Sequence, residues 1–225
     1  MKTIRPVFFC LITLVLAAAM LQAQDFSKYR NFSLGMGLPT VLKYTSQKMA
    51  DVKVIHSQPA LIQEVTWWPP PNSPGTTAQS DTVREIVFSL YNGELYKMAV
   101  TYDRTSTEGL TTPDMMKAVT AKYGPVANVP LAIDAAANDR YDMSAKIIAS
   151  WEGSQYSIDL VRSAFTDDFG LVIYSKRVNA DAELAIAEAV KLEMQDRPKR
   201  EAERQQKETD DLEVARQKNR KIFQP

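Results

Sequence analysis

Val83–Asp103, with the sequence V-R-E-I-V-F-S-L-Y-N-G-E-L-Y-K-M-A-V-T-Y-D, is the segment that decides the fold. Two runs of alternating apolar and polar residues flank the dipeptide Asn92-Gly93. Asn-Gly between such runs is typical of a tight turn that joins two antiparallel strands. The segment therefore predicts a central β-hairpin.

The alternation also predicts how the two strands of this hairpin are aligned. A turn of only two residues would place Phe88 opposite Lys97, and both faces would then mix polar and apolar side chains. A three-residue loop, Tyr91-Asn92-Gly93, with Gly93 left-handed in a bulge keeps the faces apart. We therefore predict the longer loop, with Ser89 and Lys97 on one face. The opposite face is predicted to carry Ile86, Phe88, Leu90, Tyr96, Met98 and Val100.

Length and composition indicate a globular protein. The chain has 225 residues, of which 45% are hydrophobic and 24% are charged, enough for one or two hydrophobic cores. Positive and negative side chains balance, and the pI is ≈ 6.6. Such a charge balance argues against a large binding surface for nucleic acid or for anionic membranes.

The first residues have the pattern of a secretory signal peptide. Lys2 and Arg5 precede the apolar run Val7–Leu21, and Ala23 is a small residue at a suitable cleavage point. We expect residues 1–23 to be removed and the protein to be periplasmic or secreted. The alternative is a retained membrane anchor, because the run is only slightly short of spanning length; membrane contact is expected only in that case.

Cysteine chemistry is not expected in the mature chain. The only cysteine, Cys10, lies inside the apolar run of the signal peptide. Its removal would exclude disulfides, cysteine nucleophiles and thiolate metal sites.

Further elements on both sides of the hairpin follow from periodicity and from turn residues. Residues 25–31 suggest a polar lead-in. Gly153-Ser154 suggests a two-residue turn in a second hairpin. The other predicted elements are a helix over Leu38–Met49, strands over Val52–His56 and Leu61–Trp68, an irregular loop over Pro69–Thr82, a helix from Thr112 to Tyr123, strands around Ile147–Trp151 and Tyr156–Leu160, and a strand over Leu171–Val178.

These elements predict an α+β protein with a duplicated unit of one helix and antiparallel strands. The first unit spans residues 32–103 and the second spans residues 110–178, since a single unit of this size has little core of its own. A charged C-terminal helix or tail over residues 180–225 follows.

The C-terminal segment begins with a predicted helix over Ala180–Met194. Its expected packing residues are Leu184, Ile186, Ala187, Val190 and Met194. Pro198 is expected to interrupt it. Beyond Pro198 the residues are almost all polar, which indicates either an exposed helix held by charge pairs or a frayed tail. Without an apolar heptad, a stable coiled coil is not expected.

Short motifs give the chain a resemblance to known proteins. Gly35-Met36-Gly37 precedes one helix, Tyr123-Gly124-Pro125 follows the other, and strands follow each. Over Phe32–Val178 the chain resembles the helix-plus-three-strand modules of small outer-membrane-assembly lipoproteins and of tandem β-lactamase-inhibitor proteins. The resemblance implies a non-catalytic, extracytoplasmic domain that binds other proteins through a sheet face.

Candidate catalytic and metal-binding residues have simpler explanations. His56 is the only histidine and lies near a turn, where a solvated or hydrogen-bonded histidine is expected rather than a base or a zinc ligand. No glycine-rich phosphate loop and no calcium loop occurs. The carboxylates are expected at loop ends and helix caps, although a pair of them could catalyse glycoside hydrolysis. We therefore predict no catalytic residue, no cofactor and no metal. The carboxylates concerned are Asp103, Glu108, Asp142, Asp159, Asp167 and Asp168.

The segment Trp67-Trp68-Pro69-Pro70-Pro71 is the candidate partner-binding surface. Prolines favour an extended backbone, and aromatic residues beside one can form a recognition patch. In the alternative interpretation, one tryptophan fills the core and the prolines end strand pairing. Alternation places Trp67 inside and Trp68 partly exposed, so the candidate binding residues are Trp68, Pro69, Pro70 and Pro71.

The expected function is that of an exported, non-enzymatic module that binds another protein or assists envelope assembly. The signal peptide, the lack of a catalytic constellation and the resemblance favour it. Two alternatives stay open. One is a carboxylate-dependent hydrolase of an extracellular polymer, and the other is a structural protein tethered by its N-terminal segment.

Overall fold

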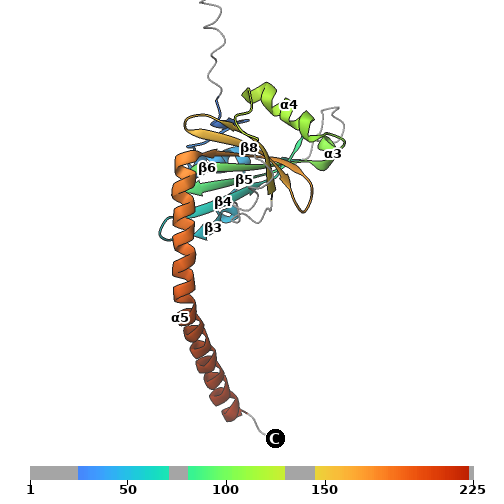
Figure 1. Ribbon diagram of the computed structural model, residues 1–225. Coiled ribbons are helices and arrows are strands. Elements are labelled where there is room, and N and C mark those ends of the chain that lie inside the picture. Colours follow the sequence, from blue (N-terminus) through green and yellow to red (C-terminus); the bar gives the residue numbers. More distant parts are fainter. Residues whose placement is uncertain (1–24, 71–80, 130–144, 223–225) are drawn as a thin grey trace, which may run out of the picture.

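A computed structural model describes residues 25–70, 81–129 and 145–222, and it confirms the α+β fold class (Figure 1). The central feature is a seven-stranded antiparallel sheet in the order β3-β4-β5-β6-β9-β8-β7. Its strands are β3 (Lys53–His56), β4 (Ile62–Trp67), β5 (Val83–Tyr91), β6 (Glu94–Tyr102), β7 (Ala145–Glu152), β8 (Tyr156–Ser163) and β9 (Phe169–Ser175).

The central hairpin forms as predicted, but its turn does not. Tyr91 pairs with Glu94, so the turn contains only Asn92 and Gly93, which have φ angles of 51° and 82°. The predicted three-residue loop is therefore wrong. Both positive φ values suit a tight turn whose twist matches that of the strands.

A β-bulge inside β6 separates the two faces instead. Leu90 pairs with Leu95 and Ser89 pairs with Lys97, which leaves Tyr96 as the extra residue. The bulge returns Met98 and Val100 to the face of Ile86, Phe88 and Leu90, as predicted. Tyr96, however, lies in a separate cluster with Ile62 and Ala182, so its predicted face is wrong.

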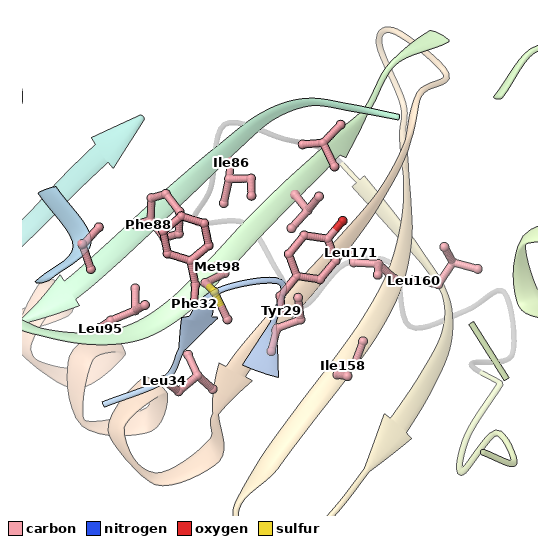
Figure 2. Packing of buried hydrophobic residues seen from close by; sticks show 14 of the residues in the cluster. Tyr29, Phe32, Leu34, Ile86, Phe88, Leu95, Met98, Ile158, Leu160 and Leu171 are labelled. Atoms are coloured by element: carbon pink, nitrogen blue, oxygen red, sulfur yellow. The ribbon is translucent and has the colours of Figure 1, made fainter. Parts of the chain in front are cut away.

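One face of the sheet carries the main hydrophobic core (Figure 2). The helices α2 (Leu38–Thr45) and α4 (Thr112–Tyr123) contribute side chains to this core. So does a two-stranded sheet of β1 (Lys28–Tyr29) and β2 (Phe32–Ser33), whose first strand lies in the predicted polar lead-in, residues 25–31. That prediction is wrong at Tyr29, which is buried. In β2, Phe32 packs against Phe88 with ring centroids 4.5 Å apart.

Local signals explain where the two covering helices begin and end. Pro39 lies in the first turn of α2, and the helix ends before Ser46, whose φ is 57°; Met49 belongs to a separate 3₁₀ turn, η1 (Met49–Asp51). The cap of α4 is Thr111, which forms a reciprocal pair of capping hydrogen bonds with Asp114. The short helix α3 (Arg104–Thr107) precedes it.

The second hairpin, β7–β8, is shifted from its prediction. Glu152 pairs with Ser157, and the Gly153 N–H donates to the Tyr156 carbonyl oxygen at 2.9 Å. The turn therefore lies after Gly153 and not at Gly153-Ser154. Because the pairing shifts by an even number of residues, Trp151 and Ile158 still share a face.

The C-terminal helix differs most from its prediction. The predicted strand ends early, at Ser175, and α5 (Lys176–Ile222) follows at once. The helix continues through Pro198, so the predicted interruption is wrong. Figure 1 shows that its first turns cross the strands at one end of the sheet and that the rest extends away from the sheet.

The two predicted units, 32–103 and 110–178, contribute to one sheet rather than to two. They meet where β6 pairs with β9, from Lys97–Tyr174 to Thr101–Gly170. The duplication itself stays a prediction.

Candidate functional site

The face of the sheet opposite the main core is covered only in part. A small cluster of Ile62, Tyr96 and Ala182 fixes α5 to it, with Val178 and Ile186 packed at its border. At the far edge, His56 Nδ1 lies 2.9 Å from Glu193 Oε1 on α5. The helix therefore crosses from β9 to β3 and leaves the strands β7 and β8 uncovered by this cluster.

A pocket of about 200 Å³ lies between the first turns of α5 and the strands β6, β9, β8 and β7. Ala99 on β6 lines the pocket with a small side chain, and Thr101, which also lines it, lies opposite Gly170 on β9. The lining residues are apolar Ala99, Val100, Ala145, Ile147, Val161, Val172 and Ile186, aromatic Tyr96 and Tyr174, and polar or charged Lys97, Thr101, Asp159, Asn179 and Glu183.

The end of the pocket near α5 is charged. Burial lowers the pKa of the Lys97 ammonium, while the nearby carboxylates of Glu183 and Glu64 act in the opposite direction. The Asn179 Nδ2 donates a hydrogen bond of 2.9 Å to Glu183 Oε1, which orients that carboxylate. Lys97 Nζ also lies 5.8 Å from the ring centroid of Tyr96.

Asp159 on β8 is the buried carboxyl group of the pocket. Burial raises the pKa of Asp159, and the hydroxyls of Ser150 and Tyr174 oppose this by donating hydrogen bonds to it. Burial also raises the pKa of Tyr174 to about 12. The charged neighbours Glu152 and Lys176 form an ion pair of 2.5 Å with each other.

The raised pKa of Asp159 predicts a pH-dependent cost to stability. Below about pH 4 the carboxyl group is protonated in both the folded and the unfolded state. As the pH rises, the unfolded state ionises first, so the protein loses stability until the folded-state pKa has been passed. Relative to wild type, Asp159→Asn should therefore gain stability as the pH rises above about 4. Urea unfolding across this range measures the difference, and a constant difference would contradict the assignment.

Most other predicted carboxylates have structural partners. Asp103 caps α3 through the Ser106 N–H at 3.2 Å, Asp167 pairs with Arg162 at 2.6 Å, and buried Asp168 pairs with Arg84 at 2.7 Å. Glu108 is exposed, and Asp142 lies outside the described residues. Among the candidates that lie in the described ranges, only Asp159 lines the pocket.

The Trp-Pro segment follows β4, next to the strand β3. Trp67 is partly buried and meets Phe32 edge-on at 5.8 Å, whereas the side chain of Trp68 is 60% exposed, as the alternation predicts. Pro69 and Pro70 follow it, and Pro71 lies outside the described residues. A partner-binding role for Trp68, Pro69, Pro70 and Pro71 stays a prediction.

The second half of α5 is the other unusual surface. Every residue from Val190 to Ile222 is exposed, and the buried side chains of the helix are Ala182, Ala185 and Ala189. Leu184 and Met194 are exposed as well, which contradicts their predicted packing, whereas Ile186 does pack against the sheet. At about 1.5 Å per residue, the exposed segment extends roughly 50 Å.

The described residues offer neither a metal cluster nor a membrane span. Over residues 25–70, 81–129 and 145–222, no group of three or more His, Cys, Asp or Glu residues is placed to hold a metal ion. None of the helices in these ranges combines the length and the apolar character that crossing a membrane requires. The predicted signal peptide lies outside these ranges.

Comparisons with known proteins identify no relative. No family model matches the chain, and neither the curated proteins nor the solved structures contain a match.

Proposed function

We propose that the chain is an exported, non-enzymatic module that binds another protein along the second half of α5. The single observation that carries this proposal is the exposure of every residue from Val190 to Ile222. The signal-peptide pattern of residues 1–23 supports export.

A helix with no packed face is a costly arrangement. Most helical stability in proteins comes from packing an amphipathic face against a neighbour. The ion pairs of this segment, Glu201–Arg204 and Glu213–Arg216, are exposed, and such pairs contribute little. A partner that packs along the helix would supply the missing burial.

The side chains of this segment define what the partner surface must offer. Exposed Leu212 provides an apolar contact in the last third of the helix, and exposed Val214 lies on a different face, because residues two apart in a helix do not face each other. Glu208, Asp210, Asp211 and Glu213 form an acidic block around Leu212, and a basic block over residues 216–221 follows. The matching partner surface is a small apolar patch with basic groups on one side and acidic groups on the other. A protein with a different charge pattern would be repelled, so this arrangement also gives selectivity.

Photo-cross-linking from defined positions tests this proposal. A photoreactive amino acid at Leu212, in the middle of the acidic block, should capture one protein reproducibly in the native envelope. Substituting the acidic block, Glu208, Asp210, Asp211 and Glu213, by lysine should reduce this capture by about tenfold or more, because like charges then face each other.

The control for this experiment is the same photoreactive residue at Phe165, which is 80% exposed on the body of the protein. Equal capture from Phe165, or capture that survives the charge reversal, would contradict binding through α5. If only a second copy of the chain is captured, α5 mediates self-association and does not bind a different protein.

Hydrolysis is a second candidate function, and one observation favours it. Asp159 and Glu183 line the same pocket, and a buried carboxyl group with a raised pKa suits a general acid. The pocket volume of about 200 Å³ is small for a segment of polymer, which favours binding instead. Turnover of an extracellular polymer that disappears in Asp159→Asn would replace the binding proposal.

A further inference from the structure

We propose that the pocket under α5 binds a small amphiphilic molecule, with a cationic amine head held by Asp159 and Glu183 and an apolar body in the hollow above Ala99. This site is separate from the exposed half of α5, so the inference does not depend on the proposed protein partner.

The combination of apolar and charged side chains in the lining suggests an amphiphile. Ala99, Val161 and Val172 on neighbouring strands form an apolar floor, and Ile147 extends it toward β7. Asp159 lies on the same face of the sheet, beside Val172, and Glu183 lines the pocket from α5. Ligand sites commonly combine a mainly apolar surface with a few polar groups that fix orientation. The volume of about 200 Å³ suits a small molecule.

The balance of charge selects a cationic head over an anionic one. Lys97 already has the carboxylates of Glu183 and Glu64 acting on it. Asp159 is an additional acidic group in the pocket. Its hydrogen bonds come from the neutral hydroxyls of Ser150 and Tyr174. An anionic head would add another negative group, whereas an ammonium would offset the cost of burying the carboxylate of Asp159.

Asp159 also retains hydrogen-bonding capacity for the ligand. An ionised carboxylate offers about four acceptor positions, and the two hydroxyls occupy two of them. An ammonium head donates hydrogen bonds, and a charge-assisted bond of this type is stronger than a neutral one. Glu183, oriented by Asn179, provides a second acceptor from the helix side.

Three probes with the same tail and different heads test the assignment. Isothermal titration of the whole chain at about pH 7.5 with n-hexylammonium, n-hexanol and n-hexanoate should give binding in that order of affinity. We expect about a tenfold advantage of the amine over the alcohol, the scale of one charge-assisted contact. Asp159→Asn should remove most of this advantage.

Two further variants locate the binding. Ala99→Leu fills the hollow and should abolish binding of all three probes, with far-ultraviolet circular dichroism confirming the fold. Glu188→Gln removes an equal charge from an exposed position on α5 that does not line the pocket, and it should change nothing. Preference for hexanoate, absence of binding by any probe, or an amine preference that survives Asp159→Asn would overturn the proposal.

Discussion

Replacing Phe88 by alanine should lower the free energy of unfolding by about 3–5 kcal/mol, the usual cost of removing a buried aromatic side chain. Phe88 is fully buried in the middle of β5, opposite Val65 on β4 and Met98 on β6. Its ring also packs against Phe32 of the N-terminal β1–β2 sheet (Figure 2). Its loss therefore leaves a cavity where the central hairpin meets the segment that covers it.

The matched control is Phe165→Ala, because the same side chain is removed from a position that is 80% exposed. This variant should stay within about 0.5 kcal/mol of wild type. Urea unfolding with a common slope compares the two. Similar losses in both variants would show that Phe88 does not occupy the centre of the core.

The central hairpin illustrates how far alternation predicts a fold. A bulge at Tyr96 and a three-residue loop both return Met98 and Val100 to the face of Phe88. The alternation of apolar and polar residues cannot distinguish the bulge from the longer loop, because the two arrangements differ only in the face on which Tyr96 lies. The sequence therefore predicts the core face and misplaces Tyr96. The preference of Asn92-Gly93 for a two-residue turn was the signal that favoured the observed geometry.

The helix α5 shows why packing residues are harder to predict than the helix itself. The size of Leu184, Val190 and Met194 made them the expected contacts, yet Ala182, Ala185 and Ala189 are the buried residues. Small side chains allow a helix to lie close to a neighbouring surface. The helix also passes Pro198, where the side chain of Arg200 donates to the Glu193 carbonyl oxygen at 3.3 Å. The missing N–H of Pro198 removes the donor of the Met194 carbonyl oxygen, so this bond lies beside that gap and does not replace the lost one.

The pocket could not be predicted from the sequence, because it exists only after several strands have been aligned. Lys97 and Asp159 were assigned to strands, but nothing local indicates that β9 lies between them. The order β6-β9-β8 places Ala99 beside Val172 and Val172 beside Asp159. One signal of the pocket was present in the sequence. The otherwise apolar strands carry several polar residues on the face opposite the main core. The buried polar residues on this face include Ser89, Thr101, Ser150, Ser157 and Asp159.

Gly170 is the residue below this hollow where a side chain should be least tolerated. A Cβ atom there would lie 2.6 Å from the Val100 carbonyl oxygen and 3.2 Å from Val161 Cγ2. Since the closest atom belongs to the backbone of β6, the strands β6 and β9 would have to separate. We expect Gly170→Val to cost about 3 kcal/mol, the upper range for overpacking, measured by urea unfolding.

Ala99→Val distinguishes this clash from a general intolerance to added volume. Ala99 lines the pocket, so two added methyl groups enter open space instead of the backbone of a neighbouring strand. This variant should stay within about 1 kcal/mol of wild type, and the difference between the two variants reports the close approach of β9 to β6. Equal stability of Gly170→Val and Ala99→Val would mean that the two strands are farther apart at Gly170.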